Sequence, residues 1–242
     1  MICFLTSSFW NGYVRNIDDD LTLNDRNDFV KRLRAFWPLK AKLLIIASNP
    51  DDINNEKYGL MYAKTFSNTF GDLKYSLIDH NNKHFDMKDY NVIVLCGGHV
   101  PTQNDFLTEL QFETKLQDFN GVLIGLSAGT MNCEKIVYAP EEEKNDFISK
   151  EYKRYLKGLG IIDKMIIPHY VYGDEKRDSL VFGKRMYKDI YIPDSYNHEL
   201  LFIEDGTYII CESNKTELFG KAYTLNKGIF KKICDDDERI IF

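Results

Sequence analysis

A serine within a short glycine-rich segment is the residue of this sequence best suited to nucleophilic chemistry. Gly125-Leu126-Ser127-Ala128-Gly129 matches the pattern Gly-x-Ser-x-Gly and directly follows an apolar run over 121–126. A sharp turn from a buried strand into a helix would strain the backbone at Ser127 and lift its hydroxyl above the edge of the sheet, near the positive end of the helix. The segment therefore predicts a nucleophile elbow, with a strand before Ser127 and a helix from Ala128.

A second glycine-rich turn has residues suited to stabilising an oxyanion. Leu95-Cys96-Gly97-Gly98-His99 ends the apolar run over 91–95. Consecutive glycines tolerate backbone conformations that turn N–H groups toward a ligand. Together with the N–H of Ala128, these amides could bind the oxygen of a tetrahedral intermediate. A tight turn that needs positive φ would explain the same residues, and the two interpretations are compatible.

A nucleophilic serine also needs a base. His169 ends the apolar run over 165–168, at the carboxyl end of a predicted core strand, where enzymes with parallel sheets present their catalytic groups. The residues alone leave open whether His169 is a base or a structural histidine. His198 lies in a polar loop, and the polar stretch around His80 and His84 indicates a surface turn rather than a metal pair.

The elements that must position these residues form an α/β pattern. Nearly continuous apolar runs over 42–47, 91–95 and 121–126 predict strands covered on both faces, and helical spacing of apolar residues marks 28–36 and 106–119. This alternation favours a parallel sheet with helices on both sides. The acidic stretch 140–146 reads as a loop, and Asp205-Gly206 before an apolar run predicts a hairpin. No linker interrupts the pattern, so we expect one domain over residues 1–242.

Composition narrows the possible partners and compartments. Apolar residues make up 44% and charged residues 28% of the chain, which excludes a disordered or collagenous protein. A net charge of −6 argues against nucleic acid as the main partner. No run approaches the ~20 apolar residues of a membrane span, and the short apolar N-terminus reads as a first strand rather than a signal peptide.

Cysteine usage points to a reducing compartment. The five cysteines are scattered and form no Cys-x-x-Cys pair, so neither a disulfide framework nor a zinc site is predicted. Cys3, Cys96 and Cys211 stand in apolar runs and are expected in the core. We therefore expect a cytoplasmic protein without a metal or other cofactor.

Four segments in order resemble those of the peptidase E (aspartyl dipeptidase) family of serine peptidases, relatives of cyanophycinase. They are similar to that family's Gly-Gly-Gly-Asn turn, its Ser-Ala-Gly-Ala segment, its Leu-Gly…Pro-His-Phe segment and its Pro-Glu-Gly or Asp-Glu-Gly segment. The corresponding residues are Cys96-Gly97-Gly98-His99, Ser127-Ala128-Gly129-Thr130, Leu159-Gly160 through Pro168-His169-Tyr170, and Ile203-Glu204-Asp205-Gly206-Thr207. The resemblance covers about residues 40–225 and extends to Thr6-Ser7-Ser8 in the opening strand.

The resemblance implies a fold and a set of catalytic roles. The fold would be that of class I glutamine amidotransferases, a three-layer α/β/α domain with a mostly parallel sheet. Ser127 would be the nucleophile, His169 the base and Glu204 the acid that orients His169, with Asp205 as the rival for that last role. The N–H groups of Gly98 and Ala128 would form the oxyanion hole.

The resemblance also implies substrate contacts. The family's aspartyl dipeptidases use an Arg downstream of the Pro-His-Phe segment to recognise an acidic residue, and Arg177 stands in that region. A surface arginine at a helix start would explain Arg177 equally well. His99 replaces the usual Asn, so it could shape the entrance of the site, contact the substrate or compete as a base.

Three functions remain open from the sequence. The leading hypothesis is a serine peptidase that cleaves small peptides such as dipeptides, including Asp-Xaa dipeptides, through an acyl-enzyme. An esterase of the α/β-hydrolase type would place its acid between Ser127 and His169 in sequence. An amidotransferase-like domain without activity would serve in binding or regulation, and its Ser127 would not react with a fluorophosphonate.

Overall fold

A mixed sheet of eight strands forms the centre of the computed structural model, which describes residues 1–12, 14 and 16–242. Its strand order is β16-β13-β12-β1-β5-β4-β2-β3. Five neighbouring strands are parallel: β1 (Ile2–Thr6), β5 (Val122–Leu126), β4 (Val92–Leu95), β2 (Ala41–Ile46) and β3 (Leu73–Ile78). Three antiparallel strands extend the sheet beyond β1: β12 (Tyr208–Glu212), β13 (Lys215–Phe219) and β16 (Arg239–Ile241).

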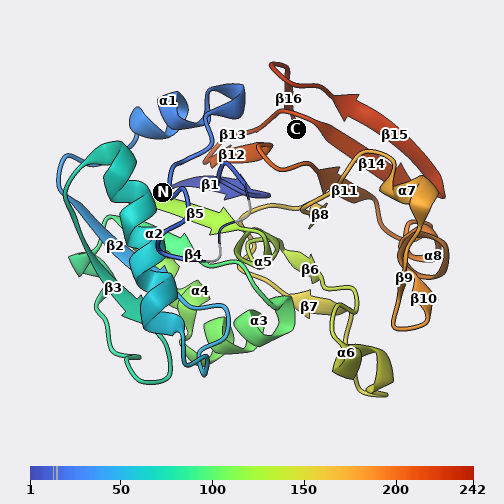
Figure 1. Ribbon diagram of the computed structural model, residues 1–242, viewed down its shortest axis with the longest axis horizontal. Coiled ribbons are helices and arrows are strands. Elements are labelled where there is room, and N and C mark those ends of the chain that lie inside the picture. Colours follow the sequence, from blue (N-terminus) through green and yellow to red (C-terminus); the bar gives the residue numbers. More distant parts are fainter. Residues whose placement is uncertain (13, 15) are drawn as a thin grey trace.

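Both faces of this sheet are covered. Successive side chains of each buried strand point to opposite faces, so each strand packs against both covering layers. Phe4 and Ile45 pack on the side of α1 (Phe29–Arg34) and α2 (Asn55–Phe70). Leu5 packs with the opposite layer, which contains α3 (Val100–Glu109), α4 (Phe112–Leu116) and the four-residue α5 (Ala128–Met131). The three-layer α/β arrangement expected from the sequence is confirmed (Figure 1).

A second sheet of four strands shares that opposite layer and was not expected. Its order is β15-β14-β11-β8, and it lies on the upper right of Figure 1. β8 (Met165–Ile167) runs parallel to β11 (Leu200–Ile203), while β14 (Ala222–Asn226) and β15 (Ile229–Cys234) are antiparallel additions. Ile166, Leu201 and Ile203 of this sheet enter the same core cluster as Leu5 and Leu123 of the large sheet.

Short elements project beside the second sheet. β6 (Ile136–Tyr138) pairs with β7 (Tyr155–Lys157), and the segment between them holds α6 (Lys144–Ile148). After β8 come α7 (Asp174–Arg177), the two-residue strands β9 (Leu180–Val181) and β10 (Lys184–Arg185), a π-helical turn at Met186–Tyr191 and α8 (Ile192–Asp194). Two 3₁₀ turns, Arg26–Asp28 and Met87–Asp89, complete the described elements.

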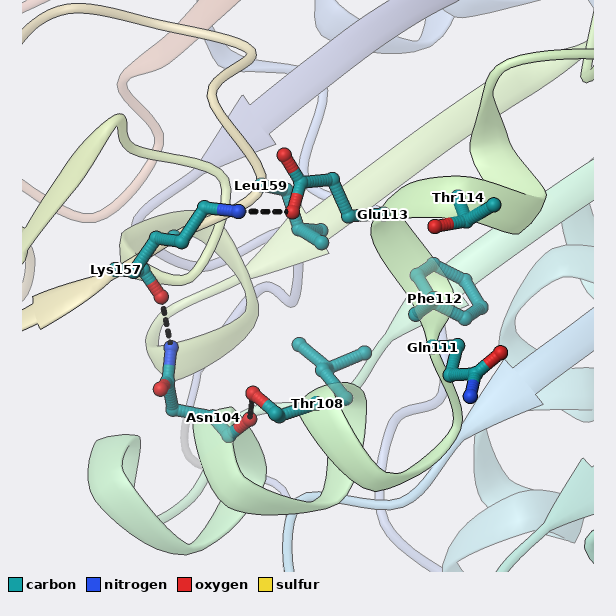
Figure 2. Close-up of a pocket in the computed structure, with 10 residues that line it drawn as sticks. Asn104, Thr108, Gln111, Phe112, Glu113, Thr114, Lys157 and Leu159 are labelled. Atoms are coloured by element: carbon teal, nitrogen blue, oxygen red, sulfur yellow. Dashed lines mark hydrogen bonds and ion pairs between the residues drawn. The ribbon is translucent and has the colours of Figure 1, made fainter.

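Buried polar side chains fix α3 against its neighbours. Asn104 donates hydrogen bonds to the carbonyl of Lys157 on β7 (3.0 Å) and to Oδ1 of Asn132, which follows α5 (2.9 Å). Figure 2 shows the first of these bonds, together with the ion pair between Lys157 and Glu113 of α4. The helix that begins just after Ser127 is therefore held to α3 and β7 rather than free to shift.

Several sequence expectations need correction. The expected helix over 106–119 is two helices, since Gln111 takes a left-handed conformation between them (φ 51°). The expected loop over 140–146 contains the start of α6, which Glu143 and Asp146 begin with a capping box. The predicted hairpin at Asp205-Gly206 is wrong, because this turn carries the chain from β11 in one sheet to β12 in the other. No helix of the described residues could span a membrane.

Gly129 allows α5 to approach β4 closely, which predicts a stability effect. A Cβ at Gly129 would lie 2.3 Å from the carbonyl oxygen of Leu95, so a substitution must displace backbone. Gly129→Ala is expected to lower the free energy of unfolding by about 1–3 kcal/mol, measured by urea denaturation. Gly59→Ala is the control, because that Cβ would meet only the Leu77 side chain at 3.3 Å and alanine favours the helix. Equal losses in both variants would contradict this account of the turn.

Candidate active site

The candidate site lies where the carboxyl ends of two pairs of parallel strands meet. In the large sheet, Thr6 of β1 is paired with Leu126 of β5, so Ser7 and Ser127 follow at the same edge. In the second sheet, Ile167 of β8 is paired with Phe202 of β11, and His169 and Asp205 follow these strands. Parallel strands of one sheet present their carboxyl ends together, and the packing of the second sheet against the large one brings residues 127, 169 and 205 to the same place.

Ser127 occupies a strained turn between β5 and α5. Its φ of 50° and ψ of −112° fall outside the regions that ordinary side chains favour. Its N–H donates to the carbonyl of Thr6, and its carbonyl accepts from Thr130 N (2.9 Å) and Met131 N (3.0 Å). The Thr130 hydroxyl donates to the Thr6 carbonyl (2.8 Å), which ties the turn to β1. The sequence expectation of a strand–turn–helix around Ser127 is confirmed.

The imidazole of His169 bridges a hydroxyl and a carboxylate. Nε2 lies 2.9 Å from Oγ of Ser127, and Nδ1 lies 2.8 Å from Oδ1 of Asp205. An ionised carboxylate can only accept, so Nδ1 carries a proton, and in the neutral imidazole Nε2 accepts the hydrogen bond of the Ser127 hydroxyl. This arrangement favours a base over a purely structural histidine, and the φ of 59° at His169 marks a second strained residue at the site.

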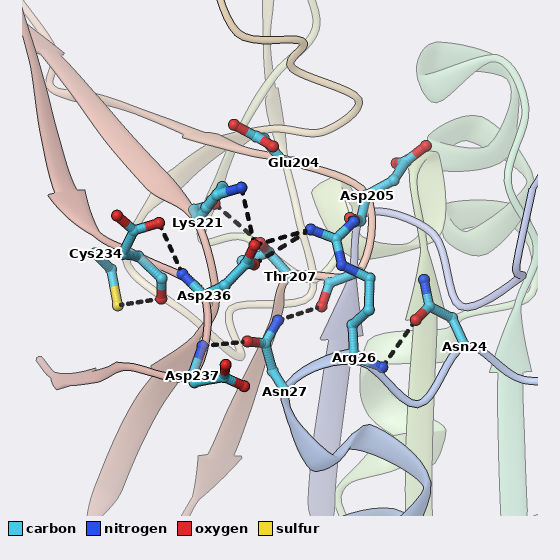
Figure 3. Close-up of polar contacts among 12 residues, drawn as sticks. Asn24, Arg26, Asn27, Glu204, Asp205, Thr207, Lys221, Cys234, Asp236 and Asp237 are labelled. Atoms are coloured by element: carbon cyan, nitrogen blue, oxygen red, sulfur yellow. Dashed lines mark hydrogen bonds and ion pairs between the residues drawn. The ribbon is translucent and has the colours of Figure 1, made fainter.

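The carboxylate beside His169 is Asp205 and not Glu204. Glu204 accepts a hydrogen bond from the Tyr223 hydroxyl (2.8 Å), away from His169. Figure 3 shows the Glu204 and Asp205 side chains pointing in different directions. β11 ends at Ile203 and the turn begins at Asp205, and of the two carboxylates only that of Asp205 reaches the imidazole. The expectation that Glu204 contacts His169 is wrong, and the rival Asp205 does so.

The charge of Asp205 is stabilised by its neighbours. Burial would raise the pKa of this carboxyl, but the hydrogen bond from His169, the His169 charge, the Ser7 hydroxyl and Arg26 together hold the pKa below its usual value. Arg26 also donates to the Asp205 carbonyl (2.7 Å) and pairs with Asp236 (3.2 Å), as Figure 3 shows. The carboxylate is therefore ionised at neutral pH. Arg26 holds the turn that carries it through the hydrogen bond to the Asp205 carbonyl.

Ser7 is a site residue to which sequence reasoning gave no role. Its side chain is fully buried; the hydroxyl donates to Oδ1 of Asp205 (2.7 Å) and accepts from the N–H of His169 (2.8 Å). One side chain thus orients both the carboxylate and the backbone of the histidine. The signal available in the sequence was its place directly after the first apolar strand, the same place that Ser127 takes after β5.

Ser7→Ala is expected to reduce kcat by roughly 10- to 100-fold with little change in KM. The variant removes a hydrogen bond to a charged group and leaves the His169 N–H without its acceptor. The triad is then less well oriented, and the activation free energy rises by about 1.5–3 kcal/mol. Steady-state kinetics of Ser7→Ala beside Ser7→Thr would measure this, since threonine keeps the hydroxyl and is expected to restore part of the rate. Unchanged kcat in Ser7→Ala would remove Ser7 from the set of positioning residues.

The glycine turn after β4 lies opposite Ser127. Gly98 has a φ of 153°, and a Cβ there would lie 2.3 Å from Oγ of Ser48, so the turn requires glycine. The N–H of Gly97 donates to the Tyr62 hydroxyl (3.0 Å), which orients this turn. Ala128 is the first residue of α5, so its N–H has no acceptor within the helix. The amides of Gly98 and Ala128 therefore remain candidates for binding an oxyanion.

Two expected substrate contacts lie elsewhere. The ring nitrogens of His99 contact Oγ1 of Thr102 (Nδ1, 2.8 Å) and Asp146 (Nε2, 3.1 Å), whereas the hydroxyl of Ser127 contacts His169, so the rival base is not placed at the nucleophile. Arg177 is 60% exposed and pairs with Asp174 (2.5 Å). Neither residue is among the described residues that line the cavity at Ser127.

That cavity has a volume of about 490 Å³ and is open to solvent. The triad residues form one wall, the glycine turn another, and Trp10 with Tyr62 an aromatic side; the described lining residues are Ser8, Trp10, Gly12, Val14, Tyr62, Gly97, Gly98, Leu126, Ser127, His169 and Asp205. None of these is Lys or Arg. The arrangement suits acyl transfer to Ser127 from a small substrate.

Comparisons with known proteins identify the family of the chain and support its fold. A family model described as peptidase family S51 matches residues 58–219, about two thirds of the chain. A search of curated proteins finds no match. Among solved structures, the chain is similar to a 1.5 Å crystal structure of a Listeria monocytogenes EGD-e protein provisionally named a peptidase E. Identity is 15% and the TM-score 0.56, over 96% of this chain and 98% of that one, so this likeness concerns the fold.

Proposed function

Because the chain belongs to peptidase family S51 and is a serine peptidase, we propose that it hydrolyses small peptides through a triad of Ser127, His169 and Asp205. The observation that carries the proposal is the unbroken line of hydrogen bonds from Ser127 Oγ through the imidazole to Asp205, at 2.9 and 2.8 Å. In this reading the strained turn at Ser127 is a nucleophile elbow. The order of residues, with the acid after the histidine, argues against an α/β-hydrolase esterase.

Acylation follows from these contacts. Oγ of Ser127 attacks the carbonyl carbon of the scissile bond while its proton passes to Nε2 of His169. The resulting oxyanion is held by the N–H groups of Gly98 and Ala128. Collapse of the intermediate breaks the C–N bond, and His169 gives its proton to the leaving amine. The acyl group remains as an ester on Ser127.

Deacylation repeats the same proton transfers with water. Water attacks the ester carbonyl and loses a proton to His169, and the C–O bond to Ser127 then breaks. His169 returns the proton to Oγ, which restores the free enzyme. Throughout, Asp205 accepts the Nδ1 hydrogen bond and stabilises the imidazolium without taking up the proton.

The cavity supports a preference for dipeptides and other short amides. A volume of about 490 Å³ holds a few residues, and Trp10 and Tyr62 are among the side chains that line it. Specificity for Asp-Xaa dipeptides lacks support from Arg177, since its guanidinium pairs with Asp174 instead of lining the cavity. We therefore propose a neutral first residue rather than an acidic one.

A reducing cytoplasm is the compartment that we propose. All five cysteines are free thiols in buried positions, among them Cys96 beside the glycine turn. Structural thiols of this kind persist where glutathione and thioredoxin keep cysteines reduced.

A hydrolysis panel tests the proposed function. Dipeptides with neutral, acidic and basic first residues, and isoaspartyl dipeptides, are incubated with the wild-type chain and with Ser127→Ala, and released amino acids are quantified by mass spectrometry. We expect hydrolysis of neutral dipeptides that Ser127→Ala abolishes. No turnover of any member, or turnover that survives in Ser127→Ala, would overturn the proposal.

A further inference from the structure

We propose that a second, aromatic pocket beside His169 binds the side chain of the residue after the scissile bond and favours a large apolar or aromatic residue there. The inference rests on the proposed function, since it assigns a subsite to the same triad. The pocket has a volume of about 240 Å³. His169 lines both this pocket and the cavity at Ser127, whereas Ser127 and the glycine turn line only the latter.

The position of the pocket relative to His169 assigns it to the leaving group. Residues before the scissile bond must lie beside the oxyanion donors Gly98 and Ala128, because the carbonyl carbon becomes bonded to Ser127. The leaving amine must lie near Nε2 of His169, which supplies its proton. The chain beyond the scissile bond therefore passes across His169, toward the pocket that begins at His169 and Tyr170.

The walls of this pocket include four aromatic rings that are already packed against one another. Phe202 stacks with Tyr187 (centroids 5.8 Å apart) and meets Tyr191 (5.3 Å) and Tyr170 (5.9 Å) edge-on. These rings belong to the core cluster of the second sheet or pack against it. They are already ordered in the free protein, so ligand binding does not have to offset the entropy of ordering them. An apolar side chain that enters would lose water on both surfaces at little entropic cost.

The charges around the pocket disfavour an acidic side chain. Asp174 is the charged residue in its described lining apart from the triad histidine, and it is paired with the exposed Arg177. Glu175 is not among the described lining residues, but it accepts a hydrogen bond (2.5 Å) from the hydroxyl of Tyr170, which is among them. A carboxylate on the side chain that enters the pocket would face these acids without a Lys or Arg among the described lining residues.

A dipeptide series with the first residue held constant tests the subsite. The second residue is Gly, Leu, Phe or Glu, and kcat/KM is measured for each. Burial of a large apolar side chain stabilises the bound transition state. We therefore expect kcat/KM of the Phe and Leu peptides to exceed that of the Gly peptide by roughly 10- to 100-fold, and kcat/KM of the Glu peptide to be the lowest.

Two neighbouring residues of β9 provide a matched pair of variants. Val181 lines the pocket, whereas the side chain of Leu180 is on the other face of the strand and 64% exposed. Val181→Trp fills the pocket and is expected to lower the ratio of kcat/KM for the Phe peptide over the Gly peptide at least tenfold. Leu180→Trp should leave this ratio as in the wild type. Met186 also lines the pocket, and Met186→Trp is expected to lower the same ratio. This second variant keeps the test informative if Val181→Trp does not fold.

The outcomes separate this inference from the proposed function. If the Gly peptide is hydrolysed in a Ser127-dependent manner but kcat/KM does not rise with apolar second residues, the subsite is wrong and the peptidase proposal stands. A preference that neither filling variant reduces would likewise exclude this pocket as its source. If no dipeptide is hydrolysed, both the inference and the proposed function are overturned.

Discussion

Ser127→Ala is expected to lower kcat/KM for every dipeptide substrate by roughly 10⁴- to 10⁶-fold, the loss found when a serine peptidase is deprived of its nucleophile. Without Oγ no acyl-enzyme can form, and His169 has no hydroxyl to deprotonate at 2.9 Å. Any residual rate would come from water attacking in a site that still binds the substrate and the oxyanion. Kinetics at substrate concentrations well below KM measure the effect directly.

A matched serine tests whether the loss is specific. Ser67 lies on α2 and is not among the described residues that line the cavity, so Ser67→Ala should retain the wild-type rate. Circular dichroism and thermal unfolding should show both variants folded, since the removed hydroxyl of Ser127 supports no part of the core. A folded Ser127→Ala variant that keeps its activity would assign the nucleophile elsewhere.

Asp205→Asn is expected to reduce kcat by about 10⁴-fold, the effect of the same change in other Ser-His-Asp enzymes. The asparagine amide can donate to Nδ1, which would leave the proton on Nε2 and stop that nitrogen from accepting the Ser127 hydroxyl. The variant also removes the negative charge that stabilises the imidazolium. Measured as kcat over a range of pH, the loss should persist at neutral pH, where the lowered pKa keeps the native Asp205 carboxyl ionised.

Glu204→Gln is the control for that variant, because the two acids are adjacent in sequence. Glu204 contacts the Tyr223 hydroxyl, so its amide should leave kcat within about threefold of the wild type. The reverse pattern, a large loss in Glu204→Gln and a small one in Asp205→Asn, would show that the orienting carboxylate is the one that the sequence favoured.

The strands and two members of the site could be predicted because they follow a local pattern. Buried parallel strands are continuous apolar runs, and Ser127 and His169 are the polar residues that end two of them. Their convergence does not follow from this pattern, because β5 and β8 belong to different sheets and only the packing of the two sheets brings the residues together. Five cysteines in buried positions, including Cys3, Cys96 and Cys211, agree with the same pattern.

The residue that acts as the acid of the triad could not be predicted from a local sequence pattern. Glu204 and Asp205 stand side by side, and which of them faces His169 depends on where β11 stops and how the chain crosses to β12. The turn signal at Asp205-Gly206 was recognised, but the local residues do not reveal that the two flanking strands belong to different sheets. Long-range pairing of β11 with β8 and of β12 with β1 decides the matter.

His99 and Arg177, which the resemblance suggested as substrate contacts, lie outside the described lining of the cavity at Ser127 for a similar reason. Each stands near a site residue in sequence, yet each finds a partner of its own, Asp146 for His99 and Asp174 for Arg177. Ser7 shows the opposite case, since it is 162 residues from His169 in sequence and within hydrogen-bond distance of its N–H in the fold.

Labelling with a fluorophosphonate tests the central claim most directly, because this reagent reacts much faster with an activated serine hydroxyl than with an ordinary one. The folded wild-type chain is treated with the probe, digested, and mapped by mass spectrometry. We predict one adduct, on Ser127, that is absent in Ser127→Ala and forms far more slowly in His169→Ala. An adduct on another serine, or labelling of Ser127 that does not depend on His169, would contradict the account.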